Sequence, residues 1–209
     1  MFDTWFTIVL VGILVQLDIL LAARGFSKVY ATHYDLAAVP SKGVYLVLAA
    51  VSIVIFPYAR ARAQPNVMVM AAMMTMGLGF VLTGALVLFR GFVGEVLGQD
   101  VASILLLLSL GAAMSFAGAT GVIANCSVAL GVARPWPPLL MGLMGLFFCW
   151  LAKPSVTVFA LVVLGIQALT MLMSLWVCLR GARGDVSADA SLGISRPKKV
   201  LGTRFLASD

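Results

Sequence analysis

Residues 12–24 read GILVQLDILLAAR, an apolar stretch that a single acid, Asp18, interrupts. The apolar run around this acid extends from Trp5 to Ala23 and is long enough to cross a bilayer as a helix. Because hydrocarbon tolerates a carboxylate poorly, the acid must face other helices or a wet cavity, where it is paired, hydrated or protonated. The stretch therefore predicts a membrane-spanning helix with one inward-facing carboxyl group.

The composition of the whole chain is that of a membrane protein. Of 209 residues, 62% are hydrophobic and 11% are charged, and the mean hydropathy is +1.10. Soluble domains carry roughly 25% charged residues. The apolar residues recur in blocks that charges or prolines bound, so we expect an all-α, polytopic integral membrane protein with the lipid bilayer as its first partner.

Residues 1–180 are expected to form a bundle of about six transmembrane helices. The expected spans are residues 5–23, 43–59, 67–89, 102–124, 136–152 and 155–179. A polar loop is expected over residues 24–42, and a short interfacial helix between Arg90 and Asp100. Residues 181–209 are rich in Gly, Ser, Asp and Lys, which predicts a mobile, basic C-terminal tail.

One apolar block is too long for a single crossing. Residues 101–133 carry no formal charge and would reach about 50 Å as one helix, whereas the hydrocarbon core is ~30 Å thick. We expect the helix to break near Asn125, Cys126 and Ser127, with the remainder reaching the interface.

Two short motifs raise the question of an internal repeat. VLFRG (87–91) ends the third expected span and VCLRG (177–181) ends the sixth. Two halves of three spans are a common transporter plan when they form inverted repeats. Since only three of the five letters agree, chance explains the similarity better than a repeat.

Six spans place both termini on one side of the membrane. With the termini inside, the inner segments carry nine Arg and Lys residues and the outer loops carry five. The five outer residues are Arg24, Lys28, Lys42, Arg90 and Lys153. This balance favours cytoplasmic termini in a plasma or inner cell membrane, although most of it comes from the tail.

The partner of Asp18 is expected on another helix. Arg24, six positions away, lies about 240° around the same helix and does not share its face. We expect Gln167 and Asn125 to support Asp18 in a polar pocket. Two interpretations stay open: an interhelical clamp, or a site for a proton, a cation or a substrate. Gln16 lies about 200° from Asp18, so we expect the two to face two different neighbours, or a neighbour and a cavity.

Small residues mark the fourth expected span as a packing helix. Gly111, Ser115 and Ala119 recur every fourth residue, and Gly121 belongs to a second such row. Small residues let helix backbones approach closely in lipid. This pattern predicts burial inside the bundle, or the contact of a homodimer or hetero-complex.

The sequence has no catalytic pattern. His33 is its one histidine, the intramembrane acid count is one, and no nucleophile or phosphate-binding motif occurs. We therefore expect no enzyme, no cofactor and no metal site. The basic residues lie at block edges and in the tail, which does not favour nucleic acid. The leading hypothesis is a small transporter or channel-like permease for an ion or small solute. The alternative is a non-catalytic subunit, assembly factor or envelope component that binds partner helices.

Overall fold

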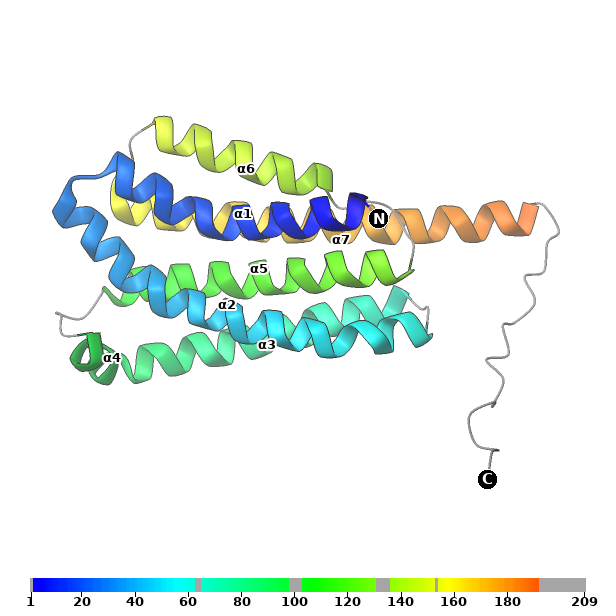
Figure 1. Cartoon of the computed structure of the whole chain (residues 1–209), viewed down its shortest axis with the longest axis horizontal. Coiled ribbons are helices and arrows are strands. Elements are labelled where there is room, and N and C mark those ends of the chain that lie inside the picture. The colour runs from blue at the N-terminus through cyan, green and yellow to red at the C-terminus, as the bar shows by residue number, and fades with distance from the viewer. Residues whose placement is uncertain (1, 63–64, 98–102, 131–135, 153, 192–209) are drawn as a thin grey trace, which may run out of the picture.

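The computed structural model describes residues 2–62, 65–97, 103–130, 136–152 and 154–191, and every element among them is an α-helix. The elements are α1 (Phe2–Gly25), α2 (Lys28–Arg62), α3 (Pro65–Leu88), α4 (Arg90–Leu97), α5 (Ile104–Leu130), α6 (Trp136–Leu151) and α7 (Val156–Ser191). Figure 1 shows the long helices running side by side as one bundle. The predicted all-α membrane bundle is thus confirmed.

Four helical segments in the described residues are long and apolar enough to cross a membrane. They are Lys28–Ile55, Asn66–Leu88, Ile104–Ala129 and Val156–Gly181. The apolar helix α6 has 16 residues and is about 24 Å long, less than the ~30 Å hydrocarbon core. Helix α1 has 24 residues, or about 36 Å. That α1 and α6 also cross stays a prediction from the sequence.

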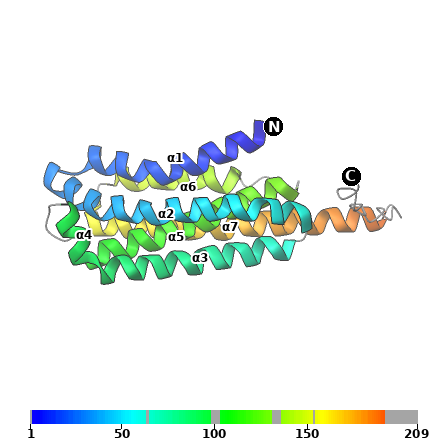
Figure 2. The ribbon, with the colours of Figure 1, turned by 60° about the horizontal axis from the view of Figure 1, so that its bottom comes forward.

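Helix α5 lies at the centre of the bundle. In the most apolar stretch of 18 residues of this helix, 78% is buried inside the bundle. Helix α5 packs against α1, α2, α3 and α7. We call α2, α3, α5 and α7 the four-helix body. Helix α1 packs chiefly on α6, which in turn packs on α7, and we call α1 and α6 the flanking pair. Both views show this pair together at one side of the body (Figures 1 and 2).

The outer faces of the helices carry large apolar side chains. Ile53 is 72% exposed, Val81 68% and Trp176 58%. In water such faces would aggregate, whereas in a bilayer they contact acyl chains at no cost. The exposure pattern therefore fits the lipid environment that the composition predicts.

Glycines bring α3 and α5 together. A β carbon at Gly111 would lie 2.5 Å from Cγ2 of Thr83, and one at Gly79 would lie 2.5 Å from Oγ of Ser115. Ser115 and Ala119 are fully buried. The small-residue row thus packs against α3 within the chain. Gly121 differs, because a β carbon there would meet nothing within 4 Å.

The expected loop over residues 24–42 is wrong, because α2 begins at Lys28 and continues to Arg62. It contains Pro40 and Pro57, each of which removes one backbone donor. Membrane helices tolerate proline where side chains and neighbouring helices satisfy the freed groups. The consequence is that Lys42 lies inside a helix.

Two other boundaries differ from expectation. Helix α5 continues through Asn125 to Leu130 without the expected break, and its 27 residues reach about 40 Å, so the excess length is accommodated by tilt or protrusion. Helix α7 continues to Ser191, so the first part of the expected tail is helical; residues 192–209 lie outside the described residues. The short helix expected after Arg90 is present as α4.

The helix ends and the packing bear on topology. The beginning of α1 and the end of α7 lie at the same end of the bundle (Figure 1). An inverted 3+3 repeat would relate the α5–α7 contact to an α1–α3 contact. Helices α5 and α7 pack extensively, whereas α1 and α3 do not pack as a pair in the described part of the chain. The packing therefore gives no support to the repeat.

Candidate functional site

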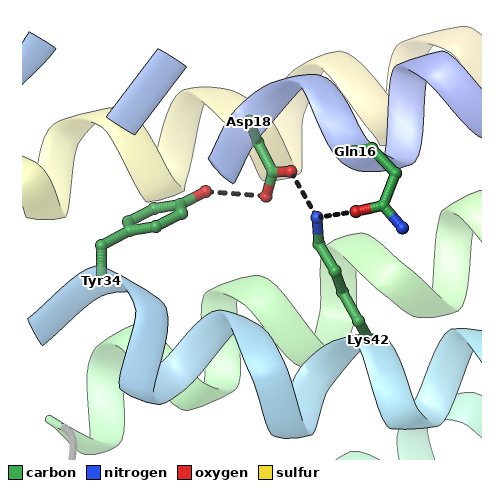
Figure 3. Close-up of polar contacts among 4 residues, drawn as sticks. All are labelled: Gln16, Asp18, Tyr34 and Lys42. Atoms are coloured by element: carbon green, nitrogen blue, oxygen red, sulfur yellow. Dashed lines mark hydrogen bonds and ion pairs between the residues drawn. The ribbon is translucent and has the colours of Figure 1, made fainter. Parts of the chain in front are cut away.

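Asp18 is buried between α1 and α2. The residue is 1% exposed, and both of its carboxylate oxygens are bonded to side chains of α2. The Tyr34 hydroxyl donates to Oδ2 at 2.9 Å, and Nζ of Lys42 lies 3.0 Å from Oδ1 (Figure 3). The expectation that this acid turns inward to another helix agrees with the geometry, but its partners are not the predicted ones.

The Lys42 ammonium bridges two residues of α1. It donates to Oδ1 of Asp18 and also to Oε1 of Gln16, each at 3.0 Å (Figure 3). The prediction that Gln16 and Asp18 face two neighbours, or a neighbour and a cavity, is wrong, because both bond Lys42. Instead the flexible amide of Gln16 and the long lysine side chain meet on one side of the helix. We call Gln16, Asp18, Tyr34 and Lys42 the polar tie.

The Asp18–Lys42 pair of the polar tie is electrically neutral and largely shielded from its surroundings, whereas Gln16 is exposed. The side chain of Asp18 is 2% exposed and that of Lys42 is 11% exposed. Removing two charges from water is costly, and only close opposite charge with further hydrogen bonds offsets that cost. The tyrosine and glutamine supply those bonds, so the carboxylate and the ammonium persist as a pair inside an apolar bundle.

The two predicted partners of Asp18 lie elsewhere. Gln167 on α7 is 1% exposed, and its Oε1 has no hydrogen-bond partner among the described residues. On α5, Nδ2 of Asn125 donates to the Ser52 hydroxyl at 3.0 Å. Neither amide bonds the carboxylate, so the expected pocket of Asp18, Gln167 and Asn125 is wrong as a single cluster.

The sequence does not identify Tyr34 and Lys42 as partners of Asp18, because both belong to the segment for which it predicts a loop. Read as helix, residues 34 and 42 lie within about 80° of each other, on one face. A lysine inside an apolar helix, opposite a helix with a lone acid, is the signal that could have found the pair. The prolines and polar residues of this segment hid that signal.

A cavity lies farther along the same helices. It has a volume of about 320 Å³. Its lining residues come from α1, α2 and α5: Val11, Tyr45, Ala49, Ser52, Ile53, Gly118, Gly121, Ala124 and Asn125. We call it the α1/α2/α5 cavity. Most of this lining is apolar or small, and the polar groups are those of Tyr45, Ser52 and Asn125.

The polar tie and the cavity share one seam between α1 and α2. On α2, Tyr34, Tyr45 and Ser52 lie within about 20° of one another around the helix axis. The ten residues from Lys42 to Ser52 correspond to about 15 Å along the axis. The seam is therefore closed by charged and polar contacts from Tyr34 to Lys42, which lies midway along the span Lys28–Ile55, and it is hollow beyond them, away from the α1–α2 turn.

No metal centre competes with this site. Within the described ranges, no group of three or more His, Cys, Asp or Glu side chains is placed to hold a metal ion. The fold and the polar tie together define a helical membrane bundle with an internal ion pair. Neither protein-family models, nor curated proteins, nor solved structures give a match to this chain.

Proposed function

We propose that this protein is a small membrane transporter, a permease for a small solute or ion, with the seam between α1 and α2 as its path. One observation carries the proposal: a single helix seam is closed by a buried ion pair near its middle and is hollow toward one end. A path that is closed on one side of a central site and open on the other is the arrangement that alternating access requires.

The packing suggests which parts would move. Helix α1 packs chiefly on α6, while α2, α3 and α7 pack around α5. In our proposal the flanking pair rocks against the four-helix body. Opening the tie separates Asp18 from Lys42 and Tyr34, while the cavity end closes. Because unpaired charges are costly in a bilayer, protonation of the carboxylate or arrival of a solute would have to offset that separation.

The site residues take distinct roles in this proposal. Asp18 is the charge that the gate moves, and Asn125 is the hydrogen-bonding group of the solute site. Gln167 has no bond to either in the described residues and is a buried polar group of α7, not a ligand of the same pocket. The protein is proposed to act without chemistry on its solute, in a plasma or inner cell membrane with cytoplasmic termini.

The alternative from the sequence, a subunit that holds a partner helix through Asp18, fits the geometry less well. Asp18 is 1% exposed, and both oxygens are occupied by its own chain. The Gly111, Ser115 and Ala119 row is likewise packed inside the chain. A partner in a homodimer or hetero-complex would have to bind other surfaces.

Flux measurements test the proposal. Purified protein in liposomes is given a mixture of isotope-labelled amino acids, sugars, nucleosides, aliphatic alcohols and amides, and alkali cations, under an imposed pH gradient. Mass spectrometry then identifies what enters. We expect at least one compound to enter faster than in protein-free liposomes, and Asp18→Asn to abolish this entry, because the neutral amide cannot pair with Lys42.

A matched control separates the tie from general charge effects. Lys28→Met removes an exposed lysine at the beginning of the same helix and should leave entry unchanged. Monodisperse elution and an unchanged helical signal establish that Asp18→Asn is assembled. Equal entry through the wild type and an assembled Asp18→Asn variant would refute the proposed role of the tie.

A further inference from the structure

The α1/α2/α5 cavity has one amide aimed into an otherwise uncharged space. Nδ2 of Asn125 donates to the Ser52 hydroxyl, and that hydroxyl donates to the carbonyl of Ala49 at 2.8 Å. The Oδ1 atom of Asn125 accepts no hydrogen bond from the described residues, and the second hydrogen on Nδ2 is also unused. The site therefore offers one acceptor and one donor side by side.

Apart from Asn125, Ser52 and Tyr45, the lining is apolar or lacks a side chain. The cavity has room here because position 121 is glycine: a β carbon there would meet nothing within 4 Å. Asn125 follows one turn later on the same face of α5. With no charged residue in the lining, a charged ligand would lose its hydration without compensation. The chemistry selects a neutral molecule that is mainly apolar and carries one hydrogen-bonding head.

The cavity reaches the side of the bundle. Val11 at its inner wall is 6% exposed, whereas Ile53 at its rim is 72% exposed. Ile53 belongs to the span Lys28–Ile55, so this rim faces lipid and lies near one end of the span. Asn125 is four residues, or about 6 Å, from the end of the span Ile104–Ala129. A head group at interfacial depth would therefore meet the amide while its chain stays among acyl chains.

We propose that the cavity binds a neutral single-chain amphiphile with a hydroxyl or primary amide head, which enters sideways from the bilayer. This inference rests on the proposed function for its biological meaning, and it names the class of solute that the transporter would accept. A volume of about 320 Å³ is ten times the ~30 Å³ that one water occupies in the liquid, and it falls at the lower end of small-molecule pockets.

Photolabelling tests this site without any flux measurement. The protein in phosphatidylcholine nanodiscs is irradiated with a long-chain primary alcohol that carries a diazirine in its chain, and labelled peptides are mapped by mass spectrometry. We expect labels on the peptides that line the cavity, lost when the unlabelled alcohol competes. Glycerol, which shares the hydroxyl but comes from water, should not compete, and the matching fatty acid anion should label weakly.

Three variants define the site. Asn125→Leu should lower the competed labelling about fivefold, because losing the net contribution of one hydrogen bond weakens binding by about that factor. Gly121→Leu fills the open space and should abolish it. Gly77→Leu is the matched control: its β carbon also meets nothing within 4 Å, but it lies on the exposed face of α3, and labelling of the cavity should not change. The thermal midpoint of each variant verifies that it is folded.

Each failure has its own meaning. Labels spread over the lipid faces without competition would overturn the site, and equal labelling of Asn125→Leu would overturn the amide as its anchor. Equal labelling by the fatty acid anion would overturn the neutral class, and competition by glycerol would overturn entry from the bilayer. Labelling as expected without any flux would overturn the proposed transporter but not the binding site. Flux of a water-soluble compound without labelling would overturn the binding site but not the transporter.

Discussion

At the residue scale, the burial of Asp18 is the feature that requires an explanation. A lone carboxylate inside a membrane helix costs roughly 3 kcal/mol on insertion scales. The ammonium of Lys42 and the hydroxyl of Tyr34 lie at 3.0 and 2.9 Å from its two oxygens and offset this cost. The pair contributes little net stability compared with apolar residues, but it fixes how α1 is placed on α2, because each group is expensive without the other.

Tyr34→Phe tests the neutral half of the tie. The variant keeps the ring, which packs on Phe159 with centroids 5.6 Å apart, and removes only the hydrogen bond to the carboxylate. We expect the free energy of unfolding in detergent to fall by about 1 to 2 kcal/mol. Tyr30→Phe, at a position 59% exposed, is the control and should change nothing measurable. An equal loss of unfolding free energy at both positions would show that the hydrogen bond of the Tyr34 hydroxyl does not stabilise the fold.

The sequence was informative about the acid and uninformative about its partners. Hydropathy alone singles out Asp18, because a charge in an apolar run needs a neighbour whatever the fold is. Which neighbour it finds depends on where α2 begins, and Pro40 with the polar residues before it would favour a loop in a soluble chain. In a bilayer the same residues stay helical, because a helix satisfies its backbone groups within the segment itself.

At the element scale, the α3–α5 contact depends on residues without side chains. Gly111 and Gly79 let the backbones approach so closely that Thr83 and Ser115 fill the space of the missing β carbons. The row of small residues predicted this burial, because in lipid close van der Waals packing replaces the hydrophobic drive. What the row cannot predict is which helix it meets, and in the fold that helix is α3 of the same chain.

Gly111→Ala should therefore be destabilising although alanine favours helices. Its β carbon would lie 2.5 Å from Cγ2 and 2.8 Å from Oγ1 of Thr83, a stiff side chain, so the helices must separate. We expect a loss of about 1 to 3 kcal/mol in unfolding free energy. Gly84→Ala on α3, where the β carbon meets open space, should be neutral or slightly stabilising. Adding Thr83→Ala to Gly111→Ala should restore part of the loss; no restoration would contradict the proposed clash.

At the scale of the whole molecule, the fold changes the charge balance that sets orientation. The sequence predicts Lys42 in an outer loop, but the residue lies inside α2 and is paired with Asp18. Without it the outer loops carry four basic residues, Arg24, Lys28, Arg90 and Lys153, against nine on the side of the termini. The positive-inside rule then favours cytoplasmic termini more clearly than the sequence count did.

Cysteine labelling in intact cells tests this orientation. In a background without Cys126, Cys149 and Cys178, Ser27→Cys places a thiol at the exposed α1–α2 turn, and Ser191→Cys places one at the end of α7. We expect a membrane-impermeant maleimide to label position 27 in intact cells and position 191 only after permeabilisation. The reverse pattern would place the termini outside.

The interaction that holds the seam closed is open to one direct measurement, a double-mutant cycle of Asp18→Asn and Lys42→Met read as unfolding free energy in detergent micelles. Each single variant leaves one polar group buried without its partner, so each should be strongly destabilising, by about 3 to 5 kcal/mol. The double variant should lose less than the sum, with a coupling energy of about 1 to 3 kcal/mol. Strictly additive losses would show that the two residues do not interact and would contradict the ion pair on which the account depends.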